Sequence, residues 1–103
     1  MLVPFVFSEE TGGKVRPVLV VSSAGYNRGR QDVIVAAITS NLRRRLFSDY
    51  VVADWVATGL LLPSMVSSVL RTIKQTMVER RLGRIGDSEM EAVGRLLRRA
   101  LDL

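Results

Sequence analysis

The side chains that could do chemistry in this sequence are restricted in kind, because it contains neither cysteine nor histidine. The most common zinc ligands, the thiol nucleophiles and the usual general base near neutral pH are therefore missing. Of 15 basic residues only Lys14 and Lys74 are lysines, so arginine dominates. A guanidinium is planar, permanently charged and suited to bidentate contacts with phosphate. Any catalysis must use groups other than thiols and imidazoles.

Length and charge limit the class of protein. The 103 residues, 48% hydrophobic and 24% charged, fit one globular domain. A net charge of +5 favours polyanions such as nucleic acid. The apolar run at residues 1–6 is far shorter than the roughly 20 residues that cross a bilayer, so we expect no membrane segment or export signal. The absence of cysteine fits the reducing cytoplasm.

Short β-branched stretches between turn-forming residues predict about five to seven strands. The first two are expected over residues 2–7 and 15–22, with a polar loop over residues 8–14 that contains Gly12 and Gly13. Pro4 indicates that the first strand lies at a sheet edge or that Pro4 is at the beginning of the strand, because proline donates no hydrogen bond to a ladder. The second is almost continuously apolar and should be covered on both faces.

The remaining segments predict more strands and two helical elements. Residues 22–30 are turn-rich and predict a short helical turn with a serine cap. Strands are expected over residues 33–39, 50–54, 65–73 and 77–82, with a polar loop over residues 40–48 and a short apolar run over 60–62. Apolar residues from Met90 to Leu101 recur at helical spacing behind a cap at Asp87 or Ser88, and Glu91 would complete a capping box.

Strands followed by one amphipathic helix predict an α+β domain with a small curved antiparallel sheet or barrel. Four sequence blocks add a resemblance: VPFVFS at residues 3–8, KVRPVLVVSS at 14–23, DVIVAAITSN at 32–41 and LRTI at 70–73. Together they resemble the MazF/PemK family of toxins from type II toxin-antitoxin systems. We expect one such domain over residues 1–103. Relatives usually carry Gly-Asp before the first block, and Met1-Leu2 stands there instead, so the start is either misannotated or clipped.

The resemblance implies a fold and an activity. The fold would be an SH3-like, CcdB/MazF-like barrel with the terminal helix packed on it. The protein would be a cytoplasmic homodimer, restrained by a cognate antitoxin protein, that binds single-stranded RNA in a groove. It would cut messenger RNA at a short motif without a metal or other cofactor, and leave 2′,3′-cyclic phosphate and 5′-hydroxyl ends.

The same resemblance assigns catalysis to Arg16 and Thr39. RNA carries its own nucleophile, the 2′-hydroxyl, so the protein has mainly to position the phosphate and stabilise its charge. Without the resemblance, Arg16 would be taken for a surface ion-pair residue and Thr39 for a strand former. No general base is assigned, because arginine and unactivated threonine are poor proton acceptors. Glu9 and Glu10 are candidates, although loop glutamates are usually only solvated.

Further polar residues are expected to bind RNA: Lys14, Ser40, Asn41, Arg43, Arg44, Arg45 and Arg71. The three consecutive arginines either hold phosphates that flank the cut or form a solvated charge run. Arg71 either contacts phosphate or braces the sheet. The arginines at positions 80, 81 and 84 are expected on a polar strand face. Those at 95, 98 and 99 are either solvated or dock an acidic antitoxin segment.

Three aromatic residues could stack on unpaired bases, namely Tyr26, Phe47 and Trp55, but burial is the better expectation for each. Two other functions stay open, because a fold does not fix a function. One is a CcdB-like toxin that binds a protein target without catalysis, and the other is a decayed toxin that only binds antitoxin or DNA. RNA cleavage by the purified protein separates the first hypothesis from both.

Overall fold

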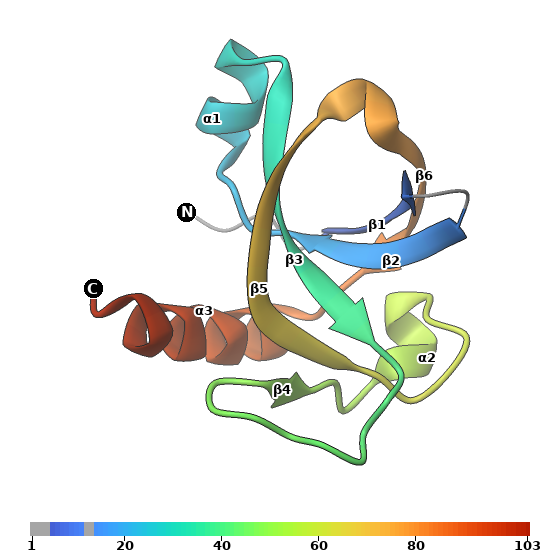
Figure 1. Ribbon diagram of the computed structural model, residues 1–103, viewed down its shortest axis with the longest axis vertical. Coiled ribbons are helices and arrows are strands. Elements are labelled where there is room, and N and C mark those ends of the chain that lie inside the picture. The colour runs from blue at the N-terminus through green and yellow to red at the C-terminus, as the bar shows by residue number, and fades with distance from the viewer. Residues whose placement is uncertain (1–4, 12–13) are drawn as a thin grey trace.

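The protein folds around one antiparallel sheet. The computed structural model describes residues 5–11 and 14–103, with side chains from residue 15 onward. Within these residues the sheet has six strands in the order β4-β5-β3-β2-β1-β6. The strands are Phe5–Thr11 (β1), Lys14–Val20 (β2), Asp32–Thr39 (β3), Tyr50–Val51 (β4), Met65–Lys74 (β5) and Val78–Arg84 (β6). Figure 1 shows the sheet bent into an arch, in which β5 runs into β6 over β1 and β2. The predicted curved sheet is confirmed.

Among residues 5–11 and 14–103, four helical segments accompany the sheet: Ala24–Gly29 (α1), Trp55–Thr58 (α2), the 3-10 turn Gln75–Met77 (η1) and Asp87–Leu101 (α3). The serine-capped turn is confirmed, since the Ser23 hydroxyl accepts a hydrogen bond from the backbone N–H of Tyr26 at 3.1 Å. The C-terminal helix α3 crosses one side of the sheet (Figure 1). In the described part of the chain, no helix is long and apolar enough to cross a bilayer.

The central strand β2 is covered on both faces, as its continuous apolar character predicts. Leu19 and Val21 join the larger core cluster, to which α3 contributes Met90, Val93 and Leu97. Val18 and Val20 point to the other face and pack in a second cluster with residues of β3 and β5. Because successive side chains of a strand alternate between faces, only apolar residues at every position can serve both clusters.

Two predicted boundaries were wrong. The predicted loop over residues 8–14 is largely strand, because β1 continues to Thr11 and pairs with β2 in a long ladder that satisfies its backbone groups. The predicted strand over residues 50–54 is only two residues long, because Asp54 caps α2 by accepting from the N–H of Ala57 at 3.2 Å. Residues 2–4, the Gly12-Gly13 pair and the proposed clipped start lie outside the described residues.

The predicted capping box of α3 was also wrong. The helix starts with Gly86 at its N-cap and no side-chain hydrogen bond there. Asp87 therefore lies inside the first turn and pairs with Arg84 at 3.4 Å. Glu91 points along the helix and pairs with Arg95 at 3.5 Å. The carboxylates of Asp87 and Glu89 still stabilise the helix, because they lie in its first turn at the positive end of the helix dipole.

Glu89 ties α3 to the segment between β4 and α2. Its Oε1 accepts from the Tyr50 hydroxyl at 2.7 Å and from the N–H of Ala53 at 2.6 Å, and its Oε2 accepts from the N–H of Asp54 at 3.2 Å. Partial burial alone would raise the pKa of Glu89, but these hydrogen bonds together lower it. Burial and the adjacent carboxylate raise the pKa of Tyr50 to about 12.

We expect Glu89→Gln to destabilise the fold by about 1 kcal/mol at neutral pH, because an amide accepts fewer hydrogen bonds than a carboxylate. Because folding lowers the pKa of Glu89, its carboxylate stabilises the fold at any pH above the unfolded-state pKa. This stabilisation is lost as the pH falls through the folded-state pKa. Folding raises the pKa of Tyr50, so the stabilisation by its neutral hydroxyl is present below pH 10.0 and is lost as the pH rises to about 12.

Urea unfolding of the variant and of the wild type between neutral and acid pH measures this effect. The difference in free energy of unfolding between Glu89→Gln and the wild type should become smaller at acid pH. The matched control is Glu91→Gln, on the same helix with its carboxylate mostly exposed, which should change stability by less than about 0.5 kcal/mol. Equal curves for Glu89→Gln and wild type at neutral pH would contradict the stabilising role of this carboxylate.

Candidate functional site

The candidate site lies where β2 and β3 separate. Their ladder ends at the pair Val18 and Ala37. Continued by two residues, the same register would set Arg16 opposite Thr39, but Pro17 lacks the N–H that a continued ladder needs. Residues 14–17 of β2 therefore pair with β1 alone, and Figure 1 shows them diverging from the end of β3. The two residues assigned to catalysis thus come from the same point of the sheet.

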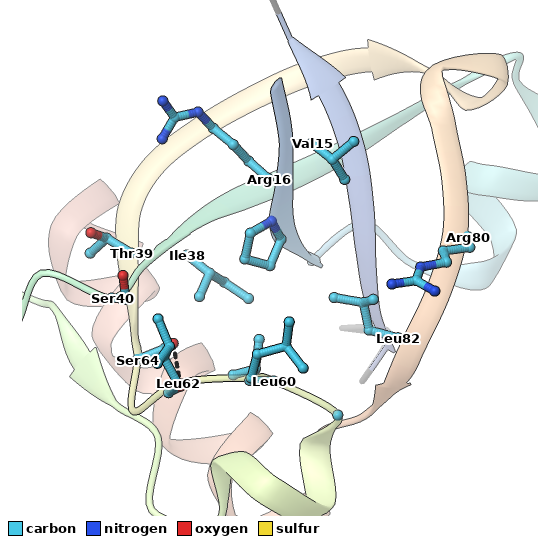
Figure 2. A pocket seen from close by; sticks show the side chains of 13 residues that line it. Val15, Arg16, Ile38, Thr39, Ser40, Leu60, Leu62, Ser64, Arg80 and Leu82 are labelled. Atoms are coloured by element: carbon cyan, nitrogen blue, oxygen red, sulfur yellow. Dashed lines mark hydrogen bonds between the residues drawn. The ribbon is translucent and has the colours of Figure 1, made fainter. Parts of the chain in front are cut away.

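A pocket of about 690 Å³ opens at this fork, and we call it the Arg16 pocket. Its lining residues are Val15, Arg16, Pro17, Ile38, Thr39, Ser40, Gly59, Leu60, Leu61, Leu62, Ser64, Arg80 and Leu82. In the view of Figure 2, Arg16 and Thr39 lie on one side of the pocket and Arg80 on the other, with Ile38, Leu60 and Leu82 between them. The volume is in the range of small-ligand sites.

Both residues assigned to catalysis are accessible. Arg16 is exposed, and no described side chain forms an ion pair or hydrogen bond with it. Thr39 is half-buried, and its Oγ1 accepts a hydrogen bond from the backbone N–H of Asn41 at 3.1 Å. In this hydrogen bond the Thr39 oxygen is the acceptor, so its position is fixed while the hydroxyl hydrogen can still be donated to a ligand. Arg16 and Thr39 thus line the same pocket, and among the described side chains none pairs with the Arg16 guanidinium.

The turn that follows β3 is held by its own side chains. The Asn41 Oδ1 accepts from the N–H of Arg43 at 3.2 Å, in series with the Thr39 contact. Ser40 lines the Arg16 pocket and also an adjoining hollow of about 430 Å³, which Arg43 borders as well. Among the residues predicted to bind RNA, Ser40 and Arg43 thus lie in or next to the pocket, and Asn41 supports the turn that carries them.

Other predicted RNA-binding residues lie elsewhere. Arg44 and Arg45 are exposed on the same loop but do not line the Arg16 pocket. Arg71 is in the middle of β5, opposite Val35 of β3, and also lies outside the pocket. The backbone of Lys14 starts β2, but its side chain is outside the described residues. Roles for these four in RNA binding stay predictions.

The sequence analysis missed the far wall of the pocket. This wall consists of residues 59–62 and of Arg80 and Leu82 in β6. Glycine and proline around the run at 60–62 marked it as a separate segment, but no pattern indicated what it would contact. The close approach of Gly59 to β6 decides that placement, since a Cβ on Gly59 would lie 2.2 Å from the carbonyl oxygen of Leu82.

The expected burial of aromatic residues was wrong for Phe47. Its side chain is 69% exposed at the tip of the β3–β4 loop, where the Arg99 guanidinium lies 5.4 Å from the ring centroid. Trp55 is half-buried and packs against the larger core cluster, as expected. Tyr26 is half-buried too, with the Arg30 guanidinium 4.8 Å from its ring centroid. Phe47 is exposed because the polar loop that carries it has no core to pack against.

The chemistry of the pocket suits an anion. Its polar side chains are two guanidiniums, from Arg16 and Arg80, and hydroxyls, from residues such as Thr39. Guanidiniums repel cations and bind phosphate or carboxylate oxygens. Within the part of the chain that the structure describes, no group of three acidic side chains is arranged to hold a metal ion.

Comparison with known proteins identifies the family. The model of the PemK-like, MazF-like toxins of type II toxin-antitoxin systems matches residues 1–101. The chain belongs to this family. It is 38% identical over 92 residues to Endoribonuclease MazF6 of Mycobacterium tuberculosis and to Endoribonuclease MazF2 of Mycobacterium bovis, a match that covers 87% of this chain and 81% of each relative. The predicted resemblance to MazF/PemK toxins is confirmed.

Solved structures of MazF-like toxins share the fold. Mycobacterium tuberculosis toxin MazF-mt6 superposes with a TM-score of 0.83 at 28% identity, over 96% of this chain and 97% of that one. A MazE-MazF structure from Deinococcus radiodurans gives 0.81 at 17% identity, over 100% and 96% of the two chains. At that identity the second match concerns the fold alone, and it shows how far the MazF sequence can vary around one backbone.

Proposed function

We propose that this MazF-like endoribonuclease toxin cuts single-stranded RNA within a short motif, by attack of the 2′-hydroxyl and without a metal ion. The observation that carries the proposal is the meeting of Arg16 and Thr39 in one accessible pocket. Relatives of the chain are named endoribonucleases, which supports RNA as its substrate. Messenger RNA in the cytoplasm is the expected target.

In the proposed reaction, the 2′-oxygen attacks the neighbouring phosphorus and the bond to the 5′-oxygen breaks. The products are a 2′,3′-cyclic phosphate and a 5′-hydroxyl end. Negative charge grows on the non-bridging oxygens during attack, and a fixed guanidinium beside them is most effective in a pocket that excludes much of the water. Arg16 supplies this charge, and the Thr39 hydroxyl donates to the same phosphate or orients the 2′-hydroxyl.

The apolar floor of the pocket supports the same assignment. Ile38 is 8% exposed and Leu60 is 6% exposed, so the base of the pocket is dry protein interior. A low local dielectric strengthens the attraction between a guanidinium and a phosphate. The pocket volume of about 690 Å³ is also sufficient for one nucleotide base beside the phosphate, and unpaired bases are recognised in such apolar spaces.

The proposed partners are a cognate antitoxin and a second copy of the chain. A structurally similar mycobacterial protein is described as an endoribonuclease in complex with its cognate antitoxin. We propose that an antitoxin restrains this toxin too, and that an acidic segment suits its surface because arginines are exposed on the β3–β4 loop and along α3. The homodimer implied by the family is part of the same proposal.

End-mapping of RNA fragments tests the function. Purified protein incubated with RNA in EDTA should yield fragments with cyclic phosphate and 5′-hydroxyl ends and should leave DNA of the same sequence intact. Thr39→Val should lower the cleavage rate by at least about tenfold, because the oriented donor is lost. Thr39→Ser, which keeps a hydroxyl at this position, should retain more activity than Thr39→Val.

Both Thr39 variants should unfold at temperatures close to that of the wild type, since the residue is only half-buried. Intact RNA after prolonged incubation with folded wild-type protein would overturn the proposal, as would cleavage that stops when EDTA is added. Full activity in Thr39→Val would remove the hydroxyl from the mechanism.

A further inference from the structure

Arg80 borders two cavities. One is the Arg16 pocket, and the other is a cavity of about 560 Å³ beside α1, which we call the α1 cavity. Arg80 lies in β6 opposite Ser8 of β1, while Arg16 lies in β2 opposite Glu9 of β1. With one strand between them, the two arginines have backbones roughly 10 Å apart, two strand spacings. A continuous binding surface can therefore run from one cavity to the other past Arg80.

The α1 cavity has the composition of a nucleotide site. Val20, Val33 and Val78 give it an apolar floor. Three guanidiniums, from Arg28, Arg80 and Arg81, and one carboxylate, from Glu79, also line it. Glu79 and Arg81 already take part in interactions. The side chains of Arg28 and Arg80 are exposed, and among the described side chains none forms an ion pair or hydrogen bond with either, so both can contact a ligand.

The walls of this cavity are fixed before any ligand arrives. The Gln75 side-chain amide donates to the carbonyl oxygens of Asn27 at 2.7 Å, Asp32 at 2.9 Å and Arg30 at 3.2 Å. Its backbone N–H donates to the carbonyl oxygen of Gln31 at 2.9 Å. These contacts hold η1 against the turn between α1 and β3. A preformed site loses little conformational freedom on binding, which favours affinity.

We propose that the α1 cavity is a second nucleotide-binding subsite, and that Arg80 holds the phosphate of the RNA strand as it passes between this cavity and the Arg16 pocket. The inference rests on the proposed function, because it extends the path of the same RNA substrate. The occupant is a nucleotide of single-stranded RNA. Its base lies on the apolar floor and its phosphates lie against Arg28 and Arg80.

Binding of a fluorescein-labelled, random-sequence 2′-O-methyl RNA hexamer tests the charge contacts, because its blocked 2′-oxygen prevents cleavage. Anisotropy titrations over a range of salt concentrations give both affinity and the slope of log K against log salt. Arg80→Met and Arg28→Met should each weaken binding by about fivefold and reduce the magnitude of the slope by about 0.7, the value for one lost phosphate contact. The matched control is Arg84→Met, which removes a guanidinium of the same strand outside both cavities and should leave the slope unchanged.

A second pair of variants tests the base. Ala24 is exposed and lines the α1 cavity. Ala24→Phe fills part of this space and should weaken hexamer binding without changing the salt slope. The control Ala100→Phe, on the exposed side of α3, should change neither the affinity nor the slope. Thermal unfolding of all variants confirms that each is folded.

The outcomes separate the second subsite from the proposed function. If the wild type cleaves RNA in EDTA but Arg80→Met keeps the wild-type slope, or Ala24→Phe keeps the wild-type affinity, the second subsite is wrong and the function stands. If the wild type neither cleaves RNA nor binds the hexamer, both proposals fail together.

Discussion

Arg16→Met should lower the rate of RNA cleavage by about 10²- to 10³-fold, the usual loss when one preorganised donor to a developing oxyanion is removed. Methionine keeps most of the length of the side chain and removes the charge and all five donors. The loss should appear mainly in kcat, because the contact strengthens as charge grows on the phosphate. Initial rates on a defined RNA over a range of substrate concentrations measure it.

The controls for this prediction separate chemistry from folding and from net charge. Arg16 is exposed, so its replacement should change the free energy of unfolding by less than about 0.5 kcal/mol. Arg95→Met removes the same charge from α3, where the guanidinium pairs with Glu91, and should leave kcat unchanged. Arg16→Lys should rank between wild type and Arg16→Met, because it keeps the charge and loses the planar fork. A folded Arg16→Met that cleaves at the wild-type rate would remove Arg16 from the mechanism.

The strands that depend on local pattern were predictable. Val18 to Val21 are apolar without a break, and burial on both faces follows from that alone. The start of α3 was misplaced because Asp87 and Ser88 are both good caps in isolation, and the backbone instead turns at Gly86. The strand character of residues 8–11 could not be deduced from their polarity, because it comes from the pairing of all four with β2 and of Ser8 and Glu9 with β6 as well.

The near side of the candidate site could be predicted and the far side could not. Arg16 and Thr39 lie at the ends of strands that the family blocks already identify. Arg80 resembles any exposed arginine of a polar strand, and only the three-dimensional approach of β6 to α2 brings it to the pocket. That approach depends on a contact between two backbone segments, and no pattern of side chains in the sequence predicts such a contact.

The close approach of Gly59 and Gly83 holds the far wall of the pocket in place, and we expect Gly83→Ala to disrupt it. A Cβ on Gly83 would lie 2.2 Å from the carbonyl oxygen of Thr58. Backbone cannot turn aside as a side chain can, so β6 and the end of α2 would have to separate. Overpacking of this kind costs about 1–3 kcal/mol, and the upper part of that range corresponds to a fall in melting temperature of about 10–20 °C.

The same separation should also lower RNA cleavage, because the run at 60–62 and Arg80 would move away from Arg16 and Thr39. Thermal unfolding and cleavage below the melting temperature measure the two effects separately. The matched control is Gly29→Ala in α1, where a new Cβ meets no atom within 4 Å and helix propensity favours alanine. It should keep or slightly raise stability. If Gly83→Ala melts at the wild-type temperature, the two backbone segments can adjust to a methyl group, and glycine at this position is not what holds the pocket closed on its far side.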